Sequence, residues 1–187
     1  SDWTNDLALS PDGTQLISAS FDRTVQVWEL PAGNSAAILS DHRAPVWAIA
    51  LGPDNLLVSG GLDKTVLLWD LEKEKPIATL TEEQAGSVRS LALSTDGLLL
   101  ATGWFDRHIR IWRLKPGKRK RAIPTGAIAF EAHAGKVEAL AFAPDGTVLA
   151  SGGAEGMVKL WRLDPKERRV VVGGERGDRP PPMVLDS

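Results

Sequence analysis

The chain has 187 residues, of which 43% are hydrophobic, and its formal net charge is −2. Cysteine is absent, which excludes disulfides and thiolate metal sites, and a cytoplasmic location is the expectation from this composition. No apolar run reaches the roughly 18 residues that a membrane span requires, and the near-neutral charge predicts no general attraction to nucleic acid or to a membrane surface.

A short motif recurs four times along the chain. In each copy, a Ser or Thr is followed four positions later by an acidic residue and, six positions after the acid, by Trp. The copies occupy residues 18–28, 59–69, 102–112 and 151–161. The tryptophans recur at intervals of roughly 40–50 residues, and a period of about 40–45 residues with four strands per unit is typical of a β-propeller blade.

The apolar pattern predicts four strands in each repeat and no helix. The third strand alternates apolar and polar residues, as at Val25 and Val27, and this period of two is that of a β-strand. Turns of the Pro-Asp-Gly type separate the first two strands. The expected strands are 5–9, 15–20, 24–29 and 36–39; 46–51, 56–60, 65–70 and 76–80; 87–93, 98–103, 108–113 and 127–130; and 136–143, 148–152, 157–162 and about 168–172.

We therefore predict an all-β fold, a β-propeller segment of four four-stranded antiparallel blades over residues 1–163. The blades are expected at about 1–40, 41–81, 82–131 and 132–163, with a last strand that runs to 172. Residues 164–187 contain few apolar side chains, so we interpret them as a linker or disordered tail. The basic run 115–121 is interpreted as a solvated hairpin tip, because no aromatic residue interleaves it for base stacking.

The repeats resemble those of the WD-repeat (Trp-Asp) propeller family over about residues 3–163. The resemblance implies rings of about seven or eight blades that serve as scaffolds for protein partners. It also implies a hydrogen-bonded tetrad in each blade: a His before the first strand, a hydroxyl on the second, the turn acid and the Trp of the third. The matching residues are Ser18, Asp22 and Trp28; His42, Ser59, Asp63 and Trp69; Thr102, Asp106 and Trp112; and His133, Ser151, Glu155 and Trp161.

Three blades depart from the full tetrad. The His position of the first blade lies before the chain begins, Gln84 stands at that position in the third, and Glu155 replaces Asp in the fourth. An incomplete set is expected to leave a buried polar group without a partner, which is costly. These residues are interpreted as structural and not as a catalytic triad, because the pattern occurs four times and an active site is expected once.

Four blades normally form only part of a ring, and an open ring exposes its ends. Three arrangements remain open from the sequence: a segment cut from a longer propeller, two copies joined into an eight-bladed ring, or an arc with capped ends. The first is favoured, because the chain begins within a repeat and without Met. The partners expected are therefore further blades or a second copy, besides a protein ligand.

The resemblance places partner binding on the face that carries the turns between second and third strands and the loops that enter the first strands. Aromatic side chains bordered by Arg are typical of protein interfaces. The cationic residues expected to border this face are Arg23, Lys64, Arg89 and Arg107. The alternative is that its aromatic side chains pack between blades. The predicted partner-binding residues are Trp3, Phe21, Trp47, Leu62, Arg89 and Phe105.

No phosphate-binding glycine loop and no His cluster is present, so no catalytic residue, metal or cofactor is predicted. The predicted function is a non-catalytic scaffold that binds a protein or peptide. The alternative is a regulatory or sensor propeller attached to an enzyme domain, such as a kinase, protease or NTPase, outside this chain. In a third reading, the blades only complete a ring.

Overall fold

The computed structural model describes residues 2–82, 84–116, 122–163 and 183–185. Over these ranges the chain forms four antiparallel sheets of four strands each and no helix, which confirms the predicted fold class. Each sheet takes its strands in chain order. The strands are β1 (Thr4–Leu9), β2 (Gln15–Ser20), β3 (Val25–Glu29) and β4 (Asn34–Leu39); β5 (Val46–Leu51), β6 (Leu56–Gly61), β7 (Thr65–Asp70) and β8 (Lys75–Thr81); β9 (Val88–Leu93), β10 (Leu99–Trp104), β11 (His108–Pro116) and β12 (Ala122–Glu131); and β13 (Val137–Phe142), β14 (Val148–Gly153), β15 (Val158–Arg162) and β16 (Met183–Leu185).

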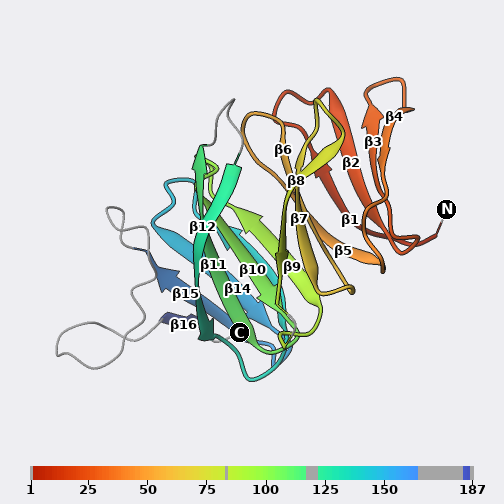
Figure 1. The fold of residues 1–187 in the computed structure, drawn as a ribbon. Coiled ribbons are helices and arrows are strands. Elements are labelled where there is room, and N and C mark those ends of the chain that lie inside the picture. The colour runs from red at the N-terminus through yellow and green to blue at the C-terminus, as the bar shows by residue number, and fades with distance from the viewer. Residues whose placement is uncertain (1, 83, 117–121, 164–182, 186–187) are drawn as a thin grey trace.

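The four sheets are the blades of an open arc. They follow one another in chain order from the red N-terminal sheet to the blue C-terminal sheet (Figure 1). The first strands of neighbouring blades lie side by side, because β5 contacts both β1 and β9, and β9 contacts β13. The first and last sheets stay apart, so the blades make part of a ring.

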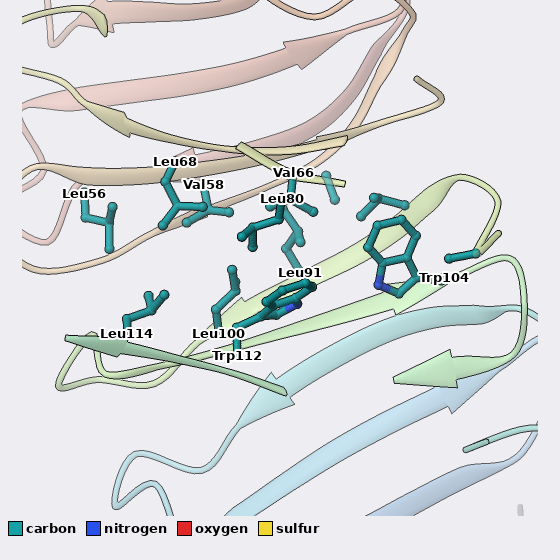
Figure 2. Packing of buried hydrophobic residues seen from close by; sticks show 13 residues of the cluster. Leu56, Val58, Val66, Leu68, Leu80, Leu91, Leu100, Trp104, Trp112 and Leu114 are labelled. Atoms are coloured by element: carbon teal, nitrogen blue, oxygen red, sulfur yellow. The ribbon is translucent and has the colours of Figure 1, made fainter. Parts of the chain in front are cut away.

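Each pair of neighbouring blades encloses its own apolar core. Between the second and third blades, Val58 and Leu68 on one sheet face Leu91, Leu100 and Trp112 on the next (Figure 2). Separate buried clusters fill the junction of the first and second blades and that of the third and fourth. This arrangement explains the continuous apolar runs of the second strands, since an inner strand of a middle blade is covered on both faces.

The turn between second and third strands has the same backbone form in every blade. The residue after the turn acid adopts a left-handed conformation, with φ values of 77°, 65°, 73° and 83° at Arg23, Lys64, Arg107 and Gly156. Only the fourth blade uses the glycine that this conformation favours. The other three turns have a long cationic side chain at this position. The cationic border of the predicted partner-binding face therefore lies at the tips of these three turns.

Two parts of the structure differ from the strands expected from the sequence. The third blade ends in a long hairpin, because β11 and β12 continue into the insertion to Pro116 and from Ala122. The strand expected at 168–172 lies outside the described residues, as do 117–121 of the basic run. Residues 183–185, within the segment interpreted as a linker or disordered tail, pair with β15 as β16.

Candidate partner-binding face

The second blade contains the complete tetrad. His42 Nδ1 lies 2.9 Å from Asp63 Oδ2, and its Nε2 lies 2.7 Å from Ser59 Oγ. Trp69 Nε1 donates to the same hydroxyl at 2.8 Å. Because a carboxylate only accepts, the proton on the imidazole is assigned to Nδ1, and the Ser59 hydroxyl donates to Nε2. All four side chains thereby satisfy one another inside the blade.

The fourth blade forms the same arrangement with a longer acid. His133 Nε2 lies 2.7 Å from Ser151 Oγ, and Nδ1 lies 2.5 Å from Glu155 Oε1. Trp161 Nε1 donates to Ser151 at 2.8 Å. The extra methylene is accommodated beside Gly153, where any Cβ would lie 2.2 Å from Glu155 Oε2 and 2.4 Å from His133 Nδ1. Glycine at this position therefore makes room for the histidine and its carboxylate.

The third blade replaces the missing histidine with a tryptophan. Trp104 stands at the position of Gly153 and is fully buried. Its Nε1 donates to Thr102 Oγ1 at 2.7 Å, while Trp112 Nε1 donates to the same oxygen at 3.0 Å. Gln84, which stands at the histidine position, is exposed. The expected unsatisfied hydroxyl is therefore absent in this blade, because a second indole replaces the imidazole.

The turn acid of the third blade is paired with an arginine. Arg110 is 8% exposed, and its Nη2 donates to Asp106 Oδ2 at 2.8 Å. The guanidinium carbon also lies 5.0 Å from the centre of the Trp104 ring, in a cation–π arrangement. Glu82 contributes a second carboxylate 3.8 Å from Arg110 Nε. Sequence analysis missed Trp104 and Arg110 as partners, although the exchange of glycine for tryptophan at position 104 was the available signal.

The first blade keeps the hydroxyl and the indole without a histidine. Trp28 Nε1 donates to Ser18 Oγ at 2.9 Å. Asp22 accepts from the backbone and side chain of Thr24, so its carboxylate closes the turn. Hydrogen bonding from Thr24 lowers the pKa of Asp22 despite its partial desolvation.

The two acids that contact a histidine have lowered pKa values. Burial raises the pKa of the Asp63 carboxyl, but hydrogen bonds from His42 and Thr65 outweigh burial and hold that pKa well below its ordinary value. Burial likewise opposes ionisation of Glu155, yet hydrogen bonds from its own backbone and from His133 lower its pKa to about 2. Both carboxylates are charged near neutral pH.

A backbone hydrogen bond joins each of these turns to the start of the first strand of its blade. The donors are the residues before the turn acids and the acceptors are the residues at the entries to the first strands. The four bonds run from Phe21, Leu62, Phe105 and Ala154 N–H to Trp3, Pro45, Ser87 and Lys136 C=O, at 2.8–3.0 Å. Since neighbouring first strands lie side by side, the turns and strand entries of all four blades make one surface, here called the turn face.

Three of the predicted residues are exposed on the turn face. Trp3 is 77% exposed, Phe105 48% and Phe21 39%. The Trp3 and Phe21 rings lie 6.2 Å apart at a tilted angle. Leu62 is half-buried. The face therefore presents an aromatic pair on the first blade and a single phenyl ring on the third.

The first strands carry a β-bulge at the same position in every blade. In the strand pairing, no residue on the second strand stands opposite the bulged residues, which are Asn5, Trp47, Arg89 and Glu138. A bulge re-aims a side chain at the end of a strand, and neighbouring blades use it to contact one another. Asn5 Nδ2 donates to Val46 C=O at 2.7 Å. No sequence pattern indicated the bulge, because it depends on how the strands are paired.

Trp47 and Arg89 lie in a continuous chain of contacts across three blades. The Arg89 guanidinium carbon lies 3.9 Å from the centre of the Trp47 ring, and Arg89 Nε donates to Glu138 Oε2 at 2.7 Å. Lys136 Nζ lies 2.9 Å from Glu138 Oε1 and 5.1 Å from the centre of the Phe105 ring. Trp47 is half-buried beneath this chain, and its Nε1 is the buried side-chain polar atom that lacks a partner within the described ranges.

Within the described residues, no group of three or more potential ligands is placed to hold a metal ion. The same part of the chain contains no helix long and apolar enough to cross a membrane. The turn face thus presents exposed aromatic rings beside a chain of charged and hydrogen-bonded contacts.

A family model described as WD domain, G-beta repeat matches residues 1–29, 33–70, 74–113 and 126–162. The chain belongs to the WD40 repeat family. WD40 repeats are protein-interaction scaffolds that generally bind protein partners and are generally non-catalytic. Each matched range after the first takes in residues of the fourth strand of one sheet and then continues into the first three strands of the next sheet, so the WD40 repeats of this chain are offset from the blades by one strand.

Relatives that match part of the chain include the following three proteins. Pre-mRNA-processing factor 19 of Caenorhabditis elegans is 34% identical over 114 residues, covering 59% of this chain and 23% of the relative. The Bos taurus protein of that name is 28% identical over 107 residues, covering 56% and 21%. A probable inactive protein kinase of Dictyostelium discoideum is 29% identical over 120 residues, covering 57% and 9%. The match thus spans less than a quarter of each relative.

Proposed function

We propose that this WD40 chain is a non-catalytic module that binds a protein or peptide across its turn face. Trp3, Phe21 and Phe105 serve as anchors, and Leu62, Trp47 and Arg89 form the base between them. The observation that carries the proposal is the exposure of three aromatic rings on one face, because aromatic side chains at a surface are typical binding hot spots. Membrane and nucleic-acid partners are not part of the proposal, and the cytoplasmic location stays a prediction.

The charged contacts beneath the anchors support a preorganised face. Arg89 is held by Glu138 and by the Trp47 ring, so its side chain is ordered before a partner arrives. Ordering side chains in advance reduces the entropy lost on binding. The predicted role of Trp47 is therefore indirect: its ring supports Arg89 and contributes less contact area than the exposed rings.

The experiment is to select peptides from a displayed random library on the wild-type chain and to measure the Kd of the best peptide for matched variants. Phe105→Ala and Trp3→Ala are expected to weaken binding by more than tenfold, about 1.4 kcal/mol. Lys75→Ala is the control, because Lys75 is exposed at the start of β8, at the end of the second blade opposite the turn between β6 and β7. Equal affinity of wild type, Phe105→Ala and Trp3→Ala would contradict the proposed face.

A regulatory propeller attached to an enzyme domain is a second candidate. One observation favours it: the Dictyostelium discoideum relative is named as a probable inactive protein kinase, and the match covers 9% of its length. Pre-mRNA-processing relatives point to a role in a multi-protein process instead. Both candidates use the turn face as a binding surface, so the peptide experiment tests the feature that they share.

A further inference from the structure

Two of the three junctions between blades repeat one close contact of a glycine, whereas Ala19 stands at the equivalent position in the first blade. A Cβ added to Gly60 on β6 would lie 2.4 Å from Val88 Cγ1 on the next blade, and one added to Gly103 on β10 would lie 2.7 Å from Val137 Cγ1. Neither glycine has a left-handed φ, so the backbone does not require glycine there. At Gly60 the first valine of the neighbouring blade occupies the space of the missing side chain. At Gly103 that space is shared between the first valine of the neighbouring blade and Ser90 Oγ of the same sheet.

The fourth blade keeps this glycine without the neighbour. Gly152 on β14 is equivalent to Gly60 and Gly103, and it too lacks a left-handed φ. A Cβ added to Gly152 would meet only Ala139 Cβ at 3.7 Å, an ordinary contact within the same sheet. A glycine inside a strand costs stability unless a close approach needs it. The outward face of the fourth blade thus has room for a first strand, and no first strand among the described residues lies there.

The first blade carries the complementary face. Leu7, Leu9 and Ile38 are 59%, 61% and 60% exposed on the side turned away from the second blade. The residue equivalent to Leu7 in the second blade is Ile49, which is 6% exposed because the first blade covers it. Thr4 stands at the position of Val88 and Val137, and it is exposed.

We propose that a second copy of this chain covers both open faces and closes an eight-bladed ring. The outward face of the fourth blade in one copy receives β1 of its partner, with Thr4 entering the space beside Gly152. A two-fold axis that coincides with the central axis of the ring makes the second junction between the copies identical to the first, so the assembly closes at two copies. Eight blades lie within the range that propellers adopt.

Each open end face is covered by a whole blade of the second copy and not by a single added strand. The first and last sheets each already contain four strands within the described residues, so neither end offers a missing strand position. Figure 1 shows both end sheets facing outward at opposite ends of the arc. A second copy supplies both complementary faces in the order used at the three internal junctions. The proposal does not depend on the peptide-binding function, because the end faces are separate from the turn face.

The experiment is the solution mass of the chain, measured by sedimentation or light scattering over a concentration series, together with thermal unfolding. Wild type is expected at twice 20.1 kDa. Gly152→Val is expected to have the mass of one copy. The Tm of this monomer should be unchanged or higher than that of wild-type monomer, because valine fits the open strand position without a clash. Gly60→Val is the internal comparison and is expected to lower the Tm, since the valine would collide with Val88.

Leu9→Lys on the first blade provides an independent test of the other face. Leu9 is exposed in a single copy, so the substitution should leave folding intact and halve the solution mass. Phe105→Ser is its control, because Phe105 is exposed on the turn face, and it should keep the doubled mass. A single mass for wild type at every concentration, or a doubled mass for both Gly152→Val and Leu9→Lys, would overturn the proposal.

Discussion

The second and third blades satisfy the same buried hydroxyl with different partners. In the second blade, His42 connects Ser59 to the turn acid through its two ring nitrogens. In the third blade, a second indole, that of Trp104, contacts Thr102 in place of a histidine, and a separate arginine contacts Asp106. The requirement is therefore that each buried polar group be paired, and not that a histidine provide the pairing. A missing family residue signals a compensating residue nearby in space.

The largest effect expected from this comparison concerns Trp104. Replacing it with Ala removes a fully buried indole and one partner of Thr102, so the free energy of unfolding should fall by about 3–5 kcal/mol. Urea unfolding measures the change. Phe105→Ala is the matched control, because the neighbouring ring is half exposed and its loss should cost about 0.5 kcal/mol or less. Equal losses would show that Trp104 is not a central packing residue.

A double substitution sharpens the comparison. Trp104→Gly together with Gln84→His rebuilds the residue pattern of the fourth blade, in which glycine makes room for a histidine. The double variant should be more stable than Trp104→Gly alone, since the new imidazole can again reach Thr102. Identical midpoints for the two variants would contradict the equivalence of the imidazole and the indole.

A smaller difference is expected between the second and fourth blades. Asp63→Ala should reduce the free energy of unfolding by about 1–3 kcal/mol, because it removes acceptors for His42, Thr65 and the Arg43 N–H. Glu155→Ala should cost less, because Met157 stands at the position of Thr65 and offers no side-chain donor. Chemical unfolding of both variants checks the order, and matching midpoints would contradict it.

The smallest effect is a dependence on pH that the same acids produce. The pKa of Asp63 is lower in the folded chain than its ordinary value of 3.8, so its stabilisation is complete above that value and is lost as the pH falls below it. The advantage of wild type over Asp63→Asn should therefore narrow from about pH 4 downward. For Glu155→Gln the narrowing should begin near 4.5 and end near 2. Unfolding curves at several pH values measure it, and an advantage that does not change with pH would contradict the assignment.

Much of the fold follows from local patterns in the sequence. The alternation in β3, β7, β11 and β15 reflects strands with two faces, and the spacing of the four motifs reflects one blade per repeat. The exposed rings of Phe21 and Phe105 are predicted from their positions before the turn acids, and that of Trp3 from its position at the entry to the first strand. These features are readable because they depend on residues close together in the chain.

Contacts between blades were not readable in the same way. The bulge that turns Trp47, Arg89 and Glu138 toward one another depends on the register of paired strands. The substitution of Trp104 for a histidine depends on which side chains share a volume, and the pairing of β16 with β15 joins residues separated by a long segment. The sequence by itself determined the repeated blade and its turn chemistry. Only the tertiary structure decided which polar groups are paired and which sheet faces stay open, because packing between distant segments sets both.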